Sequence, residues 1–328
     1  MKLKNKLLAA NAIIKSKLFN KPLPLAIRWK LTNRCISRCK YCNIWKIKSK
    51  ELTTKQIFSV IDELAKMGAQ RISFSGGEPM LRNDIGRILN YCNKKGISTS
   101  MNSMGVFVKE KIKELKSLDL LQLSLDGPEE IHDAVRCKGS YKTVIDAAKV
   151  AQKNNLKFTF ATTLTNFNIN KIDFLLEKGK EYNTVVGFQT LEIMYDGVGE
   201  DNINKIAPKQ ADFRKAIKKL IIEKKEYNNH IRNSIISLNY IYNWPKPKKT
   251  ECAAGKLFCV IETNGNVIPC DRINYAKKPL NCVEVGFKKA FYNMPEPHCN
   301  GCGFCGALEL SYLYCFKFNI LKDIKRFI

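Results

Sequence analysis

The sequence has no long run of apolar residues and no targeting segment of the usual kind. No stretch approaches the roughly 18 consecutive apolar residues that a membrane-spanning helix needs. Residues 1–20 also lack the unbroken apolar core and the small-residue cleavage site of a signal peptide. We therefore expect a cytoplasmic protein.

Acidic residues are scarce relative to basic ones. Asp and Glu number 30 against 56 Lys and Arg, which gives a formal net charge of +26. Such an excess favours nucleic acid, anionic lipid or an acidic substrate as a partner. However, the cations are mostly lysines spread along the chain, and aromatic residues do not alternate with arginine as they do on a platform for single strands. We interpret the charge mainly as biased composition and do not expect nucleic acid as the partner.

Cysteine, by contrast, is abundant, with 13 residues. In a small secreted domain this number would indicate disulfides. In a cytoplasmic chain of 328 residues, with several cysteines at short spacings, it favours metal ligation. Because the number is odd, we expect some cysteines to be bystanders.

Short β-rich runs alternate with helical periodicity between residues 26 and 191, which predicts six successive βα units around a parallel sheet. The predicted strands are Ala26–Leu31, Arg71–Ser75, Ser98–Asn102, Leu120–Leu125, Lys157–Thr163 and Val185–Leu191. The predicted helices are Thr53–Met67, Asp84–Lys95, Val108–Leu118, Thr143–Asn154, Ile169–Tyr182 and Pro208–Tyr227. The fold class is therefore α/β, a partial (β/α)6 TIM-like barrel, with its chemistry at the carboxyl ends of the strands.

The length leaves room for two domains at about 150 residues each. Residues 244–249, with two prolines and three lysines, break the pattern. We predict an amphipathic N-terminal helix over residues 1–24, the barrel over 25–230, a linker over 231–250, and a small cysteine-rich domain with a C-terminal helix over 251–328.

The first group of cysteines follows the first predicted strand. Cys35, Cys39 and Cys42 form a CxxxCxxC motif on the loop that leaves its carboxyl end. Three thiolates leave one of four coordination positions open. In a structural zinc site this would be a defect, whereas in a catalytic 4Fe-4S cluster it is where a ligand binds. Three unrelated cysteines or a zinc knuckle remain the alternative for this motif taken alone.

Further polar residues follow later strands of the predicted barrel. The second strand ends in Gly76, Gly77 and Glu78, where glycines let the backbone approach a ligand and a carboxylate can hold an ammonium group. The fourth strand ends at Ser124 and Asp126, whose side chains suit ribose hydroxyls, and Arg136 carries a planar fork that suits a carboxylate. Together these groups predict a pocket for an aminoacyl nucleoside.

With these motifs in this order, residues 25–195 resemble the radical S-adenosylmethionine superfamily. The resemblance implies that Cys35, Cys39 and Cys42 bind three irons of a 4Fe-4S cluster while S-adenosylmethionine chelates the fourth. It also implies reductive cleavage of this cofactor to a 5'-deoxyadenosyl radical, which abstracts hydrogen from a substrate. The cofactor contacts that it implies are Tyr41 at the adenine, Gly76, Gly77 and Glu78 at the methionine amine, Ser124 and Asp126 at the ribose, and Arg136 at the methionine carboxylate. Relatives usually have Thr-Asn-Gly after the third strand, whereas this chain has Met101-Asn102-Ser103, with Asn102 as the corresponding contact.

The second group of cysteines lies beyond residue 250. A paired CxxC alone is also typical of a zinc ribbon. However, Cys252, Gly265 followed by Cys270, and Cys299 with Cys302 resemble the SPASM and twitch auxiliary domains of the same superfamily. The resemblance implies that Cys252, Cys270, Cys299 and Cys302 bind an auxiliary 4Fe-4S cluster, so this part is predicted to be an iron-sulfur domain. The full two-cluster pattern has a longer spacing in its final cysteine group than Cys299, Cys302 and Cys305 have here. A second auxiliary cluster stays an alternative, with Cys259, Cys305 and Cys315 as its candidate ligands, and the role of Cys282 is left open.

The N-terminal segment has the pattern of a basic amphipathic helix. Leu3, Leu7, Ala10, Ile14 and Leu18 fall on one helical face, with lysines around it. Such a helix either packs against its own domain or lies on an anionic membrane. A peripheral position at the inner membrane face is thus an alternative to a purely cytoplasmic one.

The leading hypothesis is a radical enzyme that acts on a peptide or on a small molecule such as a sugar or lipid precursor. The auxiliary cluster suggests a net oxidation or a crosslink, and the resemblance implies a low-potential electron donor such as flavodoxin or ferredoxin. Two alternatives stay open: a non-catalytic zinc or iron-sulfur protein that binds nucleic acid, and a radical enzyme that modifies RNA. The barrel motifs argue against the first, because a binding module has no use for an aminoacyl-nucleoside pocket.

Overall fold

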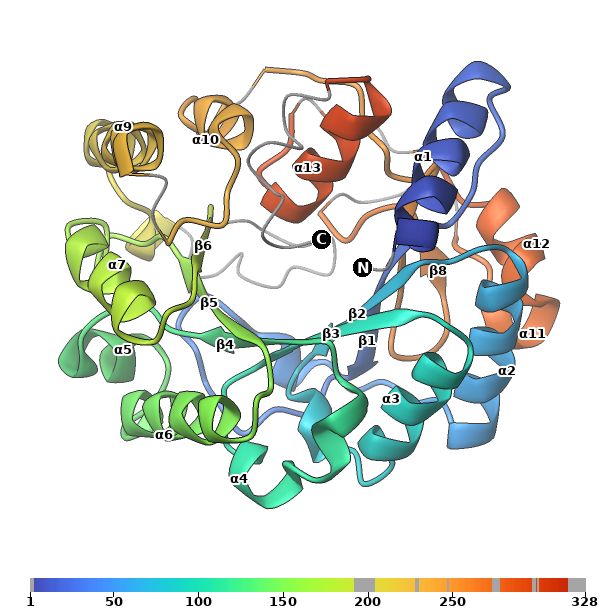
Figure 1. The fold of residues 1–328 in the computed structure, drawn as a ribbon, viewed down its shortest axis with the longest axis horizontal. Helices are drawn as coiled ribbons and strands as arrows, with labels where there is room; N and C mark the ends of the chain where they lie inside the picture. Colours follow the sequence, from blue (N-terminus) through green and yellow to red (C-terminus); the bar gives the residue numbers. More distant parts are fainter. Residues whose placement is uncertain are drawn as a thin grey trace.

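The computed structural model describes residues 3–191, 204–227, 230–246, 248–272, 278–296, 299 and 301–317. In this part of the chain, eight strands form one sheet in the order β6-β5-β4-β3-β2-β1-β7-β8 (Figure 1). Every pairing from β6 to β7 is parallel, and β8 runs antiparallel to β7. The predicted fold class, a partial barrel followed by a cysteine-rich region, is confirmed.

All six predicted strands form within two residues of their expected bounds. They are β1 Ala26–Thr32, β2 Arg71–Gly76, β3 Ser98–Ser103, β4 Leu120–Ser124, β5 Phe158–Thr163 and β6 Val186–Gln189. The helices along this part are α2 Thr54–Lys66, α3 Ile85–Lys94, α4 Val108–Lys111, α5 Glu129–Val135, α6 Ser140–Lys153, α7 Ile172–Glu181 and α9 Gln210–Tyr227. The expected start of α2 is confirmed by a capping box in which Thr53 and Gln56 satisfy each other's backbone N–H groups.

The single helix predicted over Val108–Leu118 is wrong in detail, because α4 ends at Lys111 and a 3₁₀ turn, η3, spans Glu114–Ser117. Leu115 and Leu118 are both buried and lie three residues apart. A 3₁₀ helix has three residues per turn, so this local winding brings both leucines to the core.

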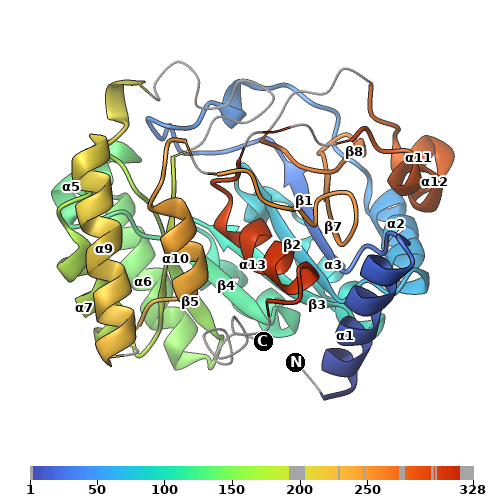
Figure 2. The same cartoon turned by 90° about the horizontal axis from the view of Figure 1, so that it is seen from above.

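The cysteine-rich region continues the barrel sheet. Its strand β7, Phe258–Ile261, pairs in parallel with β1, and β8 spans Val267–Ile268. The segment predicted as a linker contains α10, Ile235–Ile241, and buries Leu238 and Trp244. The remaining helices are α11 Cys282–Val285, α12 Phe287–Tyr292 and α13 Cys305–Tyr314. Figures 1 and 2 show α13 on the open side of the barrel, between α10 and α1, Leu3–Leu18.

The two faces of the strands differ in chemistry. Outward residues such as Trp29, Phe74 and Phe160 are buried beneath the helices in the main core. The inward positions, given by strand register and two-residue alternation, carry small polar or charged side chains instead. They include Arg28, Lys30, Arg71, Ser73, Ser75, Ser98, Ser100, Asn102, Gln122, Ser124, Thr159, Thr163 and Gln189. The barrel therefore encloses a polar lumen.

The helix α1 packs through a different face from the predicted one. Ile13 is buried in a small cluster that includes Leu257 and Tyr314, and Ser16, one turn further along the helix, is buried as well. Of the predicted apolar face, Ile14 and Leu18 are 43% and 66% exposed, while the side chains of residues 3–10 lie outside the described ones. Within the described residues, no helix is both long and apolar enough to cross a bilayer.

Candidate active site

The carboxyl ends of β1 and β2 are joined backbone to backbone. Gly77 N donates to Thr32 O at 2.7 Å, and Glu78 N donates to Arg34 O at 2.9 Å. A Cβ on Gly76 would lie 2.2 Å from Thr32 O, and a Cβ on Gly77 would lie 2.0 Å from Arg34 O. The sequence interpretation assigned these glycines to the approach of a ligand. In the structure, they are already required for the approach of the loop that leaves β1.

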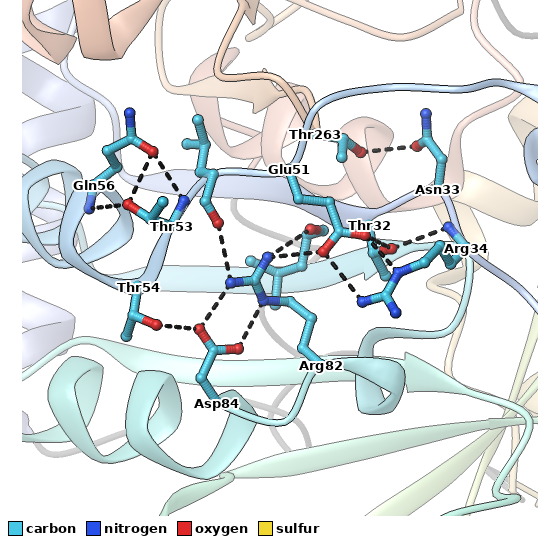
Figure 3. A network of polar contacts seen from close by, with 12 residues as sticks. Thr32, Asn33, Arg34, Glu51, Thr53, Thr54, Gln56, Arg82, Asp84 and Thr263 are labelled. Atoms are coloured by element: carbon cyan, nitrogen blue, oxygen red, sulfur yellow. Dashed lines mark hydrogen bonds and ion pairs between the residues drawn. The ribbon is translucent and has the colours of Figure 1, made fainter.

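A network of hydrogen bonds and ion pairs surrounds the start of this loop (Figure 3). Glu51 accepts hydrogen bonds from Thr32 Oγ1 at 2.6 Å and from Arg34 Nε at 2.7 Å. Buried Arg82 reaches the same carboxylate at 3.1 Å and pairs with Asp84 at 2.7 Å. Because this network links the start of the loop to the segments before α2 and α3, it restrains the position of the cysteines that follow.

The three cysteines of the CxxxCxxC motif lie together in this loop. None is in a disulfide, and each is partly buried. Burial raises the pKa of the Cys35 thiol to about 11, and negative charge on Cys39, Glu78 and Cys42 adds to this effect. Such a crowded group of acidic ligands favours a positively charged metal centre, which deprotonates coordinating thiols. The donor set thus fits an iron-sulfur cluster with one iron left for another ligand.

Glu78 is 1% exposed and bridges two strand ends. Its carboxylate accepts hydrogen bonds from Ser103 Oγ at 2.9 and 3.0 Å, from Met104 N at 3.0 Å and from Met80 N at 3.2 Å. Burial raises its pKa. Among the residues that the structure describes, no Lys, Arg or His forms an ion pair with it, so this buried carboxylate fits a ligand's ammonium group.

Asp126 holds Tyr41 and Arg136 at the same edge of the barrel. Its Oδ2 accepts from Tyr41 Oη at 2.8 Å and from Arg136 Nε at 2.6 Å, while Oδ1 accepts from Thr163 N at 3.0 Å. Burial alone would raise the pKa of Asp126, but the charges of Arg136 and His132, together with the hydrogen bonds from Arg136 and Thr163, outweigh burial and lower the pKa. Arg136 Nη1 also lies 3.9 Å from Cys39 Sγ. This group therefore connects the end of β4 directly to the cysteine loop.

The structure places Ser124 and Asn102 on the luminal faces of β4 and β3. Asn102 Oδ1 accepts from Gln122 Nε2 at 2.6 Å, so its side chain is held toward β4. The predicted cofactor contacts therefore gather at the carboxyl ends of β1 to β4. Their individual roles stay predictions.

Sequence reasoning missed two supporting residues of this edge. Ser103 stood out in the sequence only because relatives usually have glycine there, and its Oγ donates a hydrogen bond to the Glu78 carboxylate. His132 accepts from Asp126 N at 3.0 Å through Nδ1, and burial lowers its pKa to about 4, so it is neutral near pH 7. A histidine six residues after Asp126 gave no spacing signal, because the contact depends on the turn into α5.

The four cysteines of the second predicted set surround one cavity of about 70 Å³. Cys252, Cys270, Cys299 and Cys302 all line it, and none is in a disulfide. Burial, with negative charge on Cys270 and Cys252, raises the pKa of Cys302. Four thiols around one space fit a cluster in which each iron takes one protein thiolate. Among the described residues, no three His, Cys, Asp or Glu side chains converge tightly enough for a single metal ion.

The other cysteines beyond residue 250 have different surroundings. Cys259 and Cys282 are buried next to each other in the main core. Cys305 Sγ lies 3.7 Å from the Gly303 carbonyl oxygen, and Cys315 Sγ lies 3.5 Å from Glu251 Oε2. None of the four lines the cavity.

Comparison with known proteins gives a family match over the barrel. The family described as Radical SAM superfamily matches residues 29–178. The PqqA peptide cyclase of Bradyrhizobium diazoefficiens is 26% identical over 259 residues, which cover 76% of this chain and 67% of the cyclase. The AdoMet-dependent heme synthase of Methanosarcina barkeri is 24% identical over 315 residues, covering 86% of this chain and 88% of the synthase.

Solved structures share the fold. Streptococcus suis SuiB, bound to S-adenosylmethionine, superposes with a TM-score of 0.69 at 17% identity, covering 87% of this chain and 69% of SuiB. SuiB bound to its precursor peptide SuiA gives the same TM-score at 16% identity, covering 87% of this chain and 68% of SuiB. At this level of identity, the likeness concerns the fold.

Proposed function

Residues 29–178 form a radical S-adenosylmethionine domain, and from this premise we propose that the protein is a peptide-modifying radical enzyme with an auxiliary iron-sulfur cluster. When bound, the cluster and S-adenosylmethionine supply a radical that abstracts hydrogen from the substrate. The chain's own residues bind and orient these groups and keep solvent away from them.

One arrangement carries this proposal. Cys35 lies near Cys39 and Cys42 and also near Glu78, a buried carboxylate with no cation paired to it among the described residues. We assign Cys35, Cys39 and Cys42 to the cluster and Glu78, with Gly76 and Gly77, to the methionine ammonium. A non-catalytic zinc protein would have no use for an ammonium site next to its thiols.

The remaining cofactor contacts follow from the Asp126 group. Arg136, which lies close to both Asp126 and Cys39, is assigned to the methionine carboxylate. Its planar guanidinium group can donate two parallel hydrogen bonds to the two carboxylate oxygens. Tyr41 is assigned to the adenine, and Ser124 with Asp126 to the ribose. Asp126 already accepts three hydrogen bonds, so a ribose contact would use its remaining capacity.

A peptide is the substrate class that the relatives support. The PqqA peptide cyclase matches this chain in sequence, and SuiB, which binds a precursor peptide, matches it in fold. A small-molecule substrate is the second candidate. The alignment with this chain covers 88% of the heme synthase but only 67% of the peptide cyclase.

The decisive experiment is anaerobic reconstitution followed by incubation with S-adenosylmethionine and a strong reductant. We expect about eight irons per chain, from two 4Fe-4S clusters, and formation of 5'-deoxyadenosine. Replacing Cys35, Cys39 and Cys42 together by alanine serves as the control, which should abolish cleavage while about four irons remain. Zinc in place of iron, or no cleavage by the native chain, would refute the proposal.

The electron donor is proposed to be a small acidic redox protein such as flavodoxin or ferredoxin, docking on the cysteine loop. Six cations of this loop are exposed, namely Arg34, Arg38, Lys40, Lys46, Lys48 and Lys50. Complementary charge of this kind raises association rates and makes them sensitive to salt.

The measurement is the rate of cluster reduction by flavodoxin. Reversing Lys46, Lys48 and Lys50 to glutamate should slow it about tenfold or more at low salt, while reduction by dithionite stays unchanged. Reversing the exposed α9 residues Lys215, Lys218 and Lys225 is the matched control. Equal slowing by both triple variants would mean that net charge, and not this surface, governs the encounter.

Contact with an anionic membrane is proposed through the outer face of α1. Leu18 and the adjacent Phe19 are 66% and 74% exposed, and Lys15 and Lys21 are exposed beside them. An apolar ridge flanked by lysines binds anionic lipid more strongly than neutral lipid.

We expect the protein to sediment with phosphatidylglycerol vesicles at low salt and to be released as salt is added. Changing Leu18 and Phe19 to serine should remove most of this binding. The control is Ile222→Ser on α9, whose side chain is 43% exposed. Unchanged sedimentation of the double variant would exclude the α1 ridge as the contact.

A further inference from the structure

Two arginines enter the polar lumen from opposite sides. Arg71 begins β2 and pairs in register with Ala26 of β1 and Ser98 of β3. Its neighbour Ile72 is fully buried in the outer core, so strand alternation turns Arg71 inward. Arg71 belongs to neither the cysteine loop nor the cofactor contacts.

Arg232 enters from the other edge of the sheet. Its backbone N donates to Val186 O on β6 at 2.9 Å, and a Cβ on Gly187 would lie 3.4 Å from Arg232 Cδ. Its Nη1 donates to Gln122 Oε1 on β4. The Arg232 side chain therefore passes β6 and β5 and reaches the interior of the barrel, where Gln122 in turn donates to Asn102.

The positive charges of these two arginines are disfavoured by desolvation and by their mutual repulsion, and a bound anion would relieve both effects. Both side chains stay partly accessible, yet desolvation lowers the pKa of Arg71 and lowers that of Arg232 to about 10. The charge of Arg71 also lowers the pKa of Arg232, so the two guanidinium groups repel each other. Among the described residues, neither forms an ion pair. Nearby acidic groups offset the lowering of each pKa only in part. A desolvated cation whose charge is incompletely balanced destabilises a fold.

Two acidic groups lie near the arginines, and neither forms an ion pair with them among the described residues. The charge of Glu309 raises the pKa of Arg232. The Glu309 Oε1 atom accepts hydrogen bonds from Ser234 N and Ser237 Oγ at 2.9 and 2.7 Å, while its buried Oε2 atom has no hydrogen-bond partner in the described part of the chain. The charge of Asp119 raises the pKa of Arg71, and its carboxylate accepts a hydrogen bond from Thr99 N at 2.7 Å. Because neither arginine forms an ion pair with these carboxylates among the described residues, both guanidinium groups keep donors for an oxyanion that comes from outside the chain.

We propose that Arg71 and Arg232 form an anion-binding site in the barrel lumen that holds an oxyanion, carboxylate or phosphate, of the substrate. The planar guanidinium fork matches both oxyanions. Gln122, to which Arg232 donates, precedes Ser124 by two residues on β4, and Arg71 precedes Ser75 by four residues on β2. At about 3.3 Å per residue, the site therefore lies about 7–13 Å deeper than the cofactor edge. This inference rests on the proposed function, and it adds an anchor for one end of the substrate.

Binding of simple oxyanions tests the site directly. Calorimetric titration of the reconstituted full chain with inorganic phosphate and with propionate should give saturable binding of at least one of them. Arg71→Met and Arg232→Met should each weaken it at least about tenfold, because a charge-assisted bidentate contact is lost. Arg87→Met, which changes an exposed arginine on α3, should leave it unchanged. The probe that binds more tightly identifies the oxyanion as carboxylate or phosphate.

Thermal unfolding without added anion separates this role from a structural one. The two luminal variants should unfold at the native temperature or above it, because each removes a repelled and desolvated charge. A lower unfolding temperature in both variants, equal anion affinity in native and variant chains, or no binding by the native chain would overturn the inference. Cleavage of S-adenosylmethionine by the native chain, measured alongside, shows separately whether the proposed function stands.

Discussion

Replacing Gly77 by alanine is expected to reduce S-adenosylmethionine cleavage by about 100-fold or more, because a displacement of about 1 Å at a reacting centre has effects of this size. The new Cβ would lie 2.0 Å from Arg34 O, 2.6 Å from Arg34 C and 2.9 Å from Asn33 O. All three are backbone atoms, so no side chain can rotate away. The loop that carries Cys35 must then separate from the end of β2.

The measurement combines 5'-deoxyadenosine formation with iron content and the electron paramagnetic resonance signal of the reduced protein. Gly77→Ala should lose the signal of the cysteine-loop cluster and keep that of the auxiliary cluster. Gly68→Ala is the matched control, since its Cβ meets nothing within 4 Å and only its positive φ costs about 1–2 kcal/mol. Cleavage at the native rate by Gly77→Ala would mean that the loop can separate from β2 without loss of activity, and it would refute this prediction.

Replacing Cys299 and Cys302 together by alanine is expected to abolish product formation while cofactor cleavage persists. If Cys252, Cys270, Cys299 and Cys302 fill all four positions of the auxiliary cluster, that cluster has no open iron for substrate. Its role is then to support the fold or to transfer electrons. A substrate radical is a strong reductant and must lose one electron before an oxidised product forms, so a net two-electron oxidation or crosslink needs such an acceptor.

The double variant should bind about four irons instead of about eight, form 5'-deoxyadenosine at nearly the native rate and release no oxidised product. Cys305→Ala is the control, because Cys305 lies near the cavity without lining it. Product formation at the native rate would exclude the auxiliary cluster as acceptor. If the double variant loses both cofactor cleavage and soluble expression, the role of the auxiliary cluster is mainly to stabilise the fold.

Much of the barrel was predictable from the sequence because its signals are local. Alternating apolar residues such as Ile72 and Phe74 define a strand by themselves, and the capping box at Thr53 defines where a helix begins. The prediction of one continuous helix over Val108–Leu118 was wrong, because the same apolar spacing is compatible with an α-helix and with a 3₁₀ turn. Periodicity also placed Ile14 and Leu18 on one face of α1 without showing that the other face packs.

Members of the candidate site were predictable where they are close in sequence, where they follow the ends of predicted strands, or where a family resemblance implied them. Cys35, Cys39 and Cys42 lie within eight residues of one loop, so their spacing alone brings them together. Ser103 was visible only as a departure from a familiar pattern, and its hydrogen bonds to Glu78 became clear when β2 and β3 were placed side by side. His132 gave no signal at all.

The sequence by itself determined the local elements, the faces that each strand presents, and the two cysteine groups, because these depend on spacing along a short stretch of chain. Only the tertiary structure decided that β7 pairs with β1 more than 200 residues earlier. The grouping of Cys252 and Cys270 with Cys299 and Cys302 was implied beforehand by the family resemblance alone, and the structure places all four around one cavity. It also decided that Asp126 joins Tyr41 to Arg136 and that Arg71 and Arg232 enter one lumen. The physical reason is that alternation specifies which side of a strand is buried but not which strand lies beside it. That choice depends on how the whole chain buries its apolar surface and satisfies its charges.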